Sequence, residues 1–341
     1  MEKYMEYRPF GQTELEVSPI GFGCWGMAGS YGDFDESEMV AAVNRAIDLG
    51  INCFDTAQQY GMGASEQLLD RALGNRRKDV ILVTKFGTGY QHGRDSSKQM
   101  MHKAIDQSLA LLNTDYIDVY LVHWPDRDTP FEETLGAIDE LVQAGKVRYV
   151  GVSNFTPAEI ERCMAARRID VLQYGYNMFD RRQAKWIFPY AQEHNIGMMV
   201  YASLAFGLLS GVLNENTVFE GGDWRKGGGS QTSLRLFVPG IFQRNIQAVN
   251  EIKAIAADLG KSLPQLALNW VLSHPAVSTA LVGTRTVAEV EDNMPALGWT
   301  LTEDVKRKID RVFAKYEIDT APNKWIESDQ RWQDIDPMDW E

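Results

Sequence analysis

Cysteine is scarce in this 341-residue chain, and its three copies lie far apart. Cys24, Cys53 and Cys163 form no CxxC pair, and their odd number argues against a disulfide framework. Disulfides persist in oxidising compartments, so this composition favours a reducing one. Residues 1–21 carry charges where a secretion signal needs an apolar run. We therefore predict a cytoplasmic protein.

Basic residues are also in short supply. The chain has 34 Lys and Arg against 47 Asp and Glu, which gives a formal net charge of −13. Nucleic-acid and acidic-membrane binding need clustered basic residues, so the charge balance predicts neither kind of partner. The negative net charge does not exclude an anionic small ligand, because a local pocket can be basic on an acidic protein.

Long apolar runs of membrane-spanning length are lacking too. Residues 196–213, IGMMVYASLAFGLLSGVL, are uncharged and come near the length of about 20 residues that a spanning helix needs. The stretch contains three glycines and two serines, and Asn and Glu follow it rather than Lys or Arg. It is predicted to be a buried strand (196–202) that leads into a small-residue loop.

What the chain does have is a regular alternation of apolar runs and amphipathic segments. The runs are nearly continuous, as in strands buried on both faces. They lie at 20–24, 51–54, 80–83, 119–122, 147–152, 171–174, 197–201 and 279–282. The first helix is expected to begin at a capping box formed by Asp35 and Glu38 and to end at Gly50. The later helical candidates are 64–73, 96–112, 131–144, 157–167, 181–194, 243–259, 264–273 and 286–297.

Eight strands, each followed by a helix, predict a single α/β domain over 1–341, a parallel (β/α)8 TIM barrel. A doubly wound sheet is the alternative, but GFGCWG at 21–26 lacks the GxGxxG spacing of a dinucleotide turn. Three parts fall outside the eight units: an N-terminal hairpin at 5–19, a long glycine-rich loop after strand 7 at 207–240, and an acidic C-terminal extension at 316–341. The loop is long enough to be a lid or binding loop. The extension contains Trp325, Trp332 and Trp340, so we expect it to dock rather than to be disordered.

Polar residues end three successive strands of this barrel. The second strand ends on Asp55, with Tyr60 in the loop that follows; the third ends on Lys85 and the fourth on His123. In a (β/α)8 barrel the active site lies at the carboxyl ends of the strands. Taken alone, each residue has an ordinary structural explanation as a turn cap, a packed ring, a surface lysine or a core histidine. Their equivalent positions in consecutive units favour a shared site.

Together these four groups suit proton transfer. Asp55 can keep Lys85 charged, and a lysine cation beside Tyr60 is expected to lower the phenol pKa from about 10 toward neutrality. Such a phenol can donate a proton to a developing alkoxide, while His123 orients the carbonyl oxygen. The sequence offers no evident nucleophile–base pair and no metal motif. Carbonyl reduction with a hydride from a cofactor is the reaction this set indicates.

The chain also resembles a known family, the aldo-keto reductases. DTAQQYGMGASE is similar to the family signature, and YRPFGQTELEVSPIGFGCWG, VTKF, DVYLVHWPD, GKVRYVGVSNF, QYGYN and VGTRTVAEVEDN follow in the family order. The resemblance covers nearly the whole chain. It implies a barrel that uses NADP(H), or less often NAD(H), to interconvert a carbonyl and an alcohol, with Asp55, Tyr60, Lys85 and His123 as catalytic tetrad and Tyr60 as general acid and base.

The resemblance also implies cofactor contacts. Gly23 and Trp25 match the segment near the nicotinamide, and Tyr201 matches the aromatic ring that stacks on it. The groups that hold the carboxamide match Ser153, Asn154 and Gln173. The pyrophosphate path matches Ser203, Leu204, Ala205 and Gly207, and the adenosine segment matches Gly283, Thr284, Arg285, Glu289, Asp292 and Asn293.

Two departures from the family bear on the cofactor. Tyr201-Ala202-Ser203-Leu204-Ala205 stands where Tyr-Ser-Pro-Leu-Gly is common, which leaves the pyrophosphate contacts open. Glu289 stands where Gln or Arg is usual, and a carboxylate can bind a ribose 2′-hydroxyl and repel a 2′-phosphate. Arg285 favours the phosphate. NADP(H) is the cofactor we predict; Arg225 and Lys226 in the long loop either fold over its phosphates or are solvated.

The substrate and the role of the chain are less defined. Trp25 and Trp124, with Tyr60 and His123, are candidate substrate contacts, and a polar rim of Gln58, Gln59, Asp126 and Arg127 favours a sugar or another hydroxylated carbonyl. One alternative is a cofactor-binding regulatory subunit of the channel-associated type with slow turnover, since the same tetrad fits it. Another is a barrel lyase or isomerase in which Lys85 forms a Schiff base.

Overall fold

The computed structural model describes residues 5–89, 93–228 and 235–321. Its centre is a closed barrel of eight parallel strands, in the spatial order β10-β11-β12-β3-β4-β5-β8-β9. The barrel strands are β3 (Ile20–Gly23), β4 (Cys53–Asp55), β5 (Ile81–Phe86), β8 (Ile117–Val122), β9 (Val147–Ser153), β10 (Val171–Gly175), β11 (Gly197–Tyr201) and β12 (Thr279–Val282). Each coincides with one of the eight predicted runs, so the predicted TIM barrel is confirmed.

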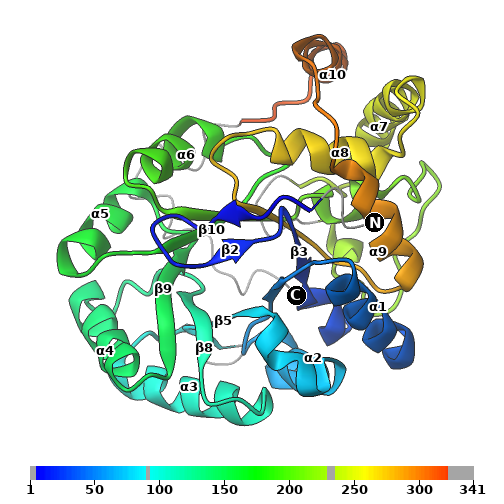
Figure 1. Ribbon diagram of the computed structural model, residues 1–341. Helices are drawn as coiled ribbons and strands as arrows, with labels where there is room; N and C mark the ends of the chain where they lie inside the picture. The colour runs from blue at the N-terminus through cyan, green and yellow to red at the C-terminus, as the bar shows by residue number, and fades with distance from the viewer. Residues whose placement is uncertain (1–4, 90–92, 229–234, 322–341) are drawn as a thin grey trace.

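Helices surround the barrel on the outside (Figure 1). They are α1 (Glu36–Asp48), α2 (Ala64–Leu73), α3 (Lys98–Leu111), α4 (Phe131–Gln143), α5 (Pro157–Ala166), α6 (Gln183–Glu193), α7 (Ile241–Asp258), α8 (Leu263–Leu272), α9 (Val287–Asn293) and α10 (Glu303–Lys315). Asp35 caps α1, because its carboxylate accepts from the N–H groups of Ser37 and Glu38 at 2.8 and 3.2 Å. Only this half of the predicted capping box is formed, since no bond from the Asp35 N–H back to the Glu38 side chain is found in the described part of the chain. The chain leaves α1 through Gly50, whose φ of +90° favours glycine.

The predicted N-terminal hairpin closes one end of the barrel. Its strands are β1 (Arg8–Pro9) and β2 (Glu16–Val17), paired antiparallel, and the hairpin crosses the barrel axis in Figure 1. Phe10 and Val17 are fully buried in a cluster with side chains from inside the barrel. Gly11 approaches the start of β11 so closely that a β-carbon there would meet Gly197 N at 2.4 Å. The carboxyl ends of the strands, where the predicted site residues lie, are at the opposite end of the barrel.

Two features differ from expectation. The helix α10 was not among the predicted segments, although Thr302 caps it and Ile309 and Phe313 repeat at helical spacing and are buried; it packs on α7. The long loop is partly ordered into 3-10 helices at Ala205–Ser210 and Trp224–Gly227.

Within the described residues, no helix combines the length and apolarity needed to cross a membrane, and the run at 196–213 is β11 followed by a 3-10 helix. Small antiparallel strands β6 (Thr88–Gly89) and β7 (Gly93–Arg94) lie between β5 and α3. Trp325, Trp332 and Trp340, and with them the predicted docking of the extension, lie outside the described residues.

Candidate active site

The four predicted strand-end groups meet at one end of the barrel. Asp55 is the last residue of β4, Lys85 is the fifth residue of β5, and His123 directly follows β8. Tyr60 opens a 3-10 helix (Tyr60–Gly63) after β4. Lys85 Nζ donates to Asp55 Oδ2 at 2.7 Å and lies 3.2 Å from Tyr60 Oη. The rings of Tyr60 and His123 meet edge to face, with centroids 5.8 Å apart.

Lys85 and Asp55 form a buried ion pair. Lys85 is fully buried and Asp55 is 3% exposed. Lys85 Nζ also donates to Thr56 O at 2.8 Å, and Gln173 Nε2 donates to the second oxygen of Asp55 at 2.7 Å. Burial raises the pKa of Asp55 and lowers the pKa of Lys85, and the attraction between them opposes both shifts. These hydrogen bonds offset part of the desolvation cost of the pair.

The expected lowering of the Tyr60 pKa is wrong. Burial, followed by the negative charge of Asp55, raises the pKa of Tyr60 well above its ordinary value. The sequence showed the Lys85 cation but not how little water reaches the phenol, and desolvation disfavours the phenolate. Tyr60 is therefore protonated near neutral pH, the state that a proton donor needs.

His123 is uncharged at neutral pH. Burial, Lys85 and Arg94 hold the pKa of His123 well below its ordinary value. Its Nδ1 lies 3.4 Å from Thr88 Oγ1. A neutral imidazole beside a protonated phenol can orient a carbonyl oxygen without competing as an acid.

A hydrogen-bonded network joins the predicted amide-binding residues to this cluster. Asn154 Nδ2 donates to Ser153 Oγ at 2.9 Å and to the carbonyl oxygen of His123 at 3.2 Å. Tyr201 Oη donates to Asn154 Oδ1 at 2.9 Å. Ser153 Oγ donates to the carbonyl oxygen of Gln173, whose side chain bonds Asp55. The structure thus brings these four predicted residues together beside the ion pair.

The loop after β11 has an unusual backbone. Positive φ angles occur at Ala202, Ala205, Phe206 and Gly207. Successive residues in left-handed or turn conformations present N–H groups on a concave surface that suits anions. Ser203, between them, is buried, with its Oγ 3.4 Å from Val200 O. This is where the pyrophosphate path was predicted.

Arg225 is clamped onto this loop rather than solvated. Its guanidinium donates to Asp223 at 2.6 and 3.0 Å and to Phe206 O at 3.1 Å. The rings of Phe219 and Tyr31 lie 4.5 and 5.0 Å from its central carbon. Arg225 therefore ties the long loop to the predicted pyrophosphate segment.

The predicted adenosine residues lie after β12 and along α9. Thr284 Oγ1 is buried and has no hydrogen-bond partner in the described part of the chain. Glu289 is exposed and accepts from the backbone N–H of Arg285 at 2.6 Å. Asp292 is held from α8, since its carboxylate accepts from Gln265 and Ser262 at 3.0 and 3.2 Å. Gly283 is exposed and Asn293 is buried.

Aromatic side chains at the mouth include two that the sequence did not single out. Trp25 packs against Tyr31 and Trp224, with centroids 4.9 and 5.6 Å away. Arg94 lies over the ring of Trp124, at 5.1 Å. Tyr31 lies in a turn, Trp224 begins a short 3-10 helix and Arg94 ends the two-residue strand β7. These segments are too short for a hydrophobic periodicity that could have marked them.

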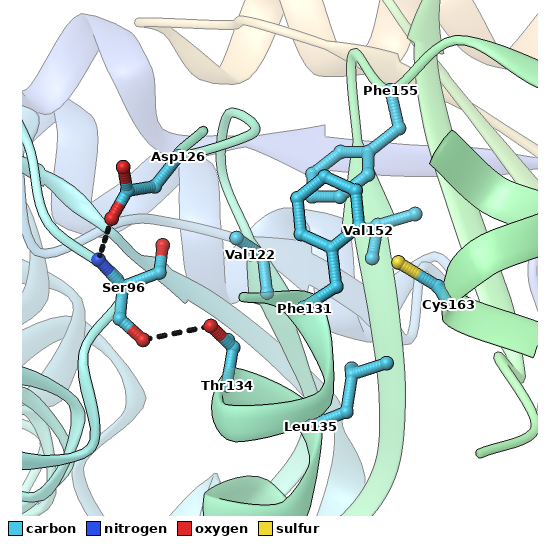
Figure 2. Close-up of a pocket in the computed structure, with 9 residues that line it drawn as sticks. All are labelled: Ser96, Val122, Asp126, Phe131, Thr134, Leu135, Val152, Phe155 and Cys163. Carbon is cyan, nitrogen blue, oxygen red and sulfur yellow. Dashed lines mark hydrogen bonds between the residues drawn. The ribbon is translucent and has the colours of Figure 1, made fainter. Parts of the chain in front are cut away.

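The predicted polar rim is bonded within the protein. Gln58 donates to Gln107 and Gln59 accepts from Thr88, at 3.0 and 2.7 Å. Arg127 donates to Glu159 at 3.3 Å. Figure 2 shows Asp126 bonded to the Ser96 backbone at the edge of a small cavity under α4 and α5, outside the barrel. The rim therefore does not carry the argument for a hydroxylated substrate.

Comparisons with known proteins agree with this geometry. The sequence profile of the Aldo/keto reductase family matches residues 19–314. The chain is 35% identical to aldo-keto reductase YhdN of Bacillus subtilis, covering 90% of this chain and 93% of that protein. It is 32% identical to a probable voltage-gated potassium channel subunit beta of Arabidopsis thaliana, covering 90% and 96%.

Solved structures are also similar. The glycerol dehydrogenase AKR11B4 of Gluconobacter oxydans has a TM-score of 0.81 and 30% identity, covering 98% of both chains. An aldo-keto reductase of Klebsiella pneumoniae in complex with NADPH has a TM-score of 0.73 and 27% identity, covering 95% of this chain and 99% of that one.

Proposed function

Because the chain belongs to the aldo/keto reductase family, we propose that it is an NADP(H)-dependent oxidoreductase that interconverts an aldehyde or ketone and its alcohol, with Tyr60 as general acid and base. The observation that carries the proposal is the chain of contacts from Asp55 through Lys85 to Tyr60, at 2.7 and 3.2 Å. It links a proton donor to a buried cation at the carboxyl ends of the strands.

Each residue of the cluster then has a task. In reduction, Tyr60 Oη gives its proton to the carbonyl oxygen as that oxygen becomes an alcohol. The Lys85 ammonium, 3.2 Å away, stabilises the phenolate that remains, and Asp55 keeps Lys85 charged and in place. His123, uncharged, orients the carbonyl oxygen. In oxidation the same groups take the proton back.

The residues fit a nicotinamide cofactor, which when bound supplies or accepts the hydride. Ser153, Asn154 and Gln173 offer amide and hydroxyl groups for the carboxamide, and the ring of Tyr201 flanks them. The left-handed loop around Gly207 suits a pyrophosphate. The unpartnered Thr284 hydroxyl and the Arg285 cation suit the adenosine end. NADP(H) is the proposed cofactor.

For the substrate we propose a small hydroxylated carbonyl compound. The similarity to a protein named glycerol dehydrogenase supports this class, whereas the polar rim does not, because its side chains bond to the protein. Trp25 and Trp124 are the proposed walls of the substrate site.

A regulatory subunit with slow turnover is the second candidate, and the relative named as a potassium channel subunit supports it.

A cytoplasmic location and a single domain over 1–341 remain predictions.

Turnover separates the two candidates. We would measure NADPH oxidation with a panel that includes glyceraldehyde, aldoses and aryl aldehydes, run NADH in parallel, and measure NADPH affinity by fluorescence. The enzyme proposal predicts steady turnover with at least one hydroxylated carbonyl and a lower rate with NADH. Tight NADPH binding with negligible turnover across the panel would favour the regulatory subunit.

A further inference from the structure

The N-terminus of α2 is bonded to three elements that carry the site. Ser65 Oγ donates to the carbonyl oxygen of Cys24, directly after β3, at 2.9 Å and lies 2.9 Å from Thr56 Oγ1. The carbonyl oxygen of that same Thr56 accepts from Lys85 Nζ at 2.8 Å. Ser65 therefore fixes one of the groups that hold Lys85.

Glu66 fixes the strand that carries Lys85. Thr84 Oγ1 donates to Glu66 Oε1 at 2.6 Å. Side chains alternate along a strand, so Thr84 points outward to α2 while Lys85 points into the barrel. Glu66 is fully buried. Its bond to Thr84 thus sets the position of β5 one residue before the catalytic lysine.

The second oxygen of Glu66 belongs to a buried polar cluster. Glu66 Oε2, Ser108 Oγ and Tyr120 Oη are all buried, and none has a hydrogen-bond partner in the described part of the chain. Ser108 is on α3 and Tyr120 on β8. A carboxylic acid can donate one proton to such a hydroxyl, whereas a carboxylate can only accept.

The surroundings of Glu66 disfavour its charge. Burial raises the pKa of Glu66, and the hydrogen bond from Thr84, the nearby Ser108 hydroxyl and the more distant Lys85 charge oppose that shift. Tyr120 lies near Glu66 on β8. Burial, followed by the charges of Glu66 and of Asp106 on α3, raises the pKa of Tyr120. The hydrogen bond to Glu66 comes from the hydroxyl group of Thr84. Lys85, the cation whose charge lowers the pKa of Glu66, is bonded to Asp55 and not to Glu66.

We propose that Glu66 is a positioning residue for the proposed reductase reaction: its carboxyl group anchors β5 through Thr84 and so holds Lys85 within reach of Asp55 and Tyr60. The role rests on the proposed function of Lys85. It gives the acidic end of the signature stretch DTAQQYGMGASE a task that the tetrad does not cover.

Three variants test the anchoring through turnover with the best carbonyl of the panel. Glu66→Gln keeps an acceptor for Thr84 but cannot ionise, Glu66→Leu removes the acceptor, and Gln67→Leu changes the exposed neighbour on α2 as a control. We expect Glu66→Leu to lower kcat by about ten- to a hundredfold, the scale of a small misplacement of a catalytic group. Glu66→Gln and the control should stay within about threefold, and NADPH affinity should be unchanged in all three.

The activity results can overturn the proposal in two ways. Wild-type kcat in Glu66→Leu would show that β5 does not need the anchor. A loss of kcat in Glu66→Gln as large as in Glu66→Leu would show that the charge of Glu66, not its hydrogen bond, is required.

Stability against pH tests the raised pKa of buried Glu66 without any assay of activity. A carboxyl whose folded pKa is raised binds more protons when folded, so its contribution to stability falls as pH rises above its unfolded pKa of about 4.3. Glutamine does not titrate. The melting temperature of Glu66→Gln minus that of the wild type should therefore grow between pH 4.5 and pH 8. A difference that is constant or shrinks over that range would contradict the buried placement of Glu66 on which the anchoring depends, and this outcome is independent of whether a substrate is found.

Discussion

At the scale of single residues, Lys85 is the group around which the site is arranged. A fully buried ammonium is unfavourable unless its donors are paired, and here Asp55, the Thr56 carbonyl and Tyr60 surround it. The same lack of water that makes this pairing necessary keeps Tyr60 protonated. Burial, more than the neighbouring charge, thus sets the resting state of Tyr60, the proposed proton donor.

Glu289 allows a charge test at the cofactor end with little change of structure. Its carboxylate accepts from the Arg285 N–H, and Glu289→Gln keeps an acceptor oxygen while removing the charge. Exposed charge pairs have modest effects, so we expect the NADPH-to-NADH ratio of kcat/KM to rise by about two- to fivefold. Arg285→Gln, which removes the opposite charge, should lower it.

An unchanged ratio in Glu289→Gln would mean that Glu289 does not sense the 2′ position of the adenosine ribose.

At the scale of elements, the strands and their ends could be predicted and the loops could not. Asp55 and Lys85 close continuous apolar runs, so the sequence alone brought them to one end of the barrel. Tyr31 and Trp224 lie in irregular segments whose contacts are not periodic. The amphipathic pattern of α10 is visible in the sequence, although no helix was predicted there. The direction of the Tyr60 pKa shift could not be predicted, because it depends on burial.

The clamp at Arg225 connects two of these loops and gives a prediction at this scale. Arg225→Lys keeps the charge but loses the paired bonds to Asp223 and the contact with Phe206 O. If the long loop covers the cofactor, NADPH should bind about tenfold more weakly, a difference of about 1.4 kcal/mol. Fluorescence titration measures this, with Lys226→Ala, the exposed neighbour, as the control.

The prediction is wrong if Arg225→Lys binds NADPH as tightly as the wild type does, or if Lys226→Ala loses as much NADPH affinity as Arg225→Lys. Either result would show that the bonds of Arg225 to Asp223 and Phe206 do not support cofactor binding.

At the scale of the whole molecule, stability and chemistry lie at opposite ends of the barrel. Phe10 from the hairpin fills the end away from Tyr60 and is fully buried. Phe10→Ala should lower the free energy of unfolding by about 3–5 kcal/mol, the usual cost of such a cavity. Denaturant unfolding measures the loss. Where the variant is folded, kcat should match the wild type; a large fall in kcat would show that the two ends are coupled.

The most direct test of the account compares the wild type with Tyr60→Phe at saturating NADPH and carbonyl substrate. The variant keeps the aromatic ring and loses only the hydroxyl that lies 3.2 Å from Lys85 Nζ. We predict that kcat falls by at least about a hundredfold, the scale of a lost general acid, while NADPH affinity stays within about twofold. Near-normal kcat in Tyr60→Phe would contradict the assignment of Tyr60 as the proton donor.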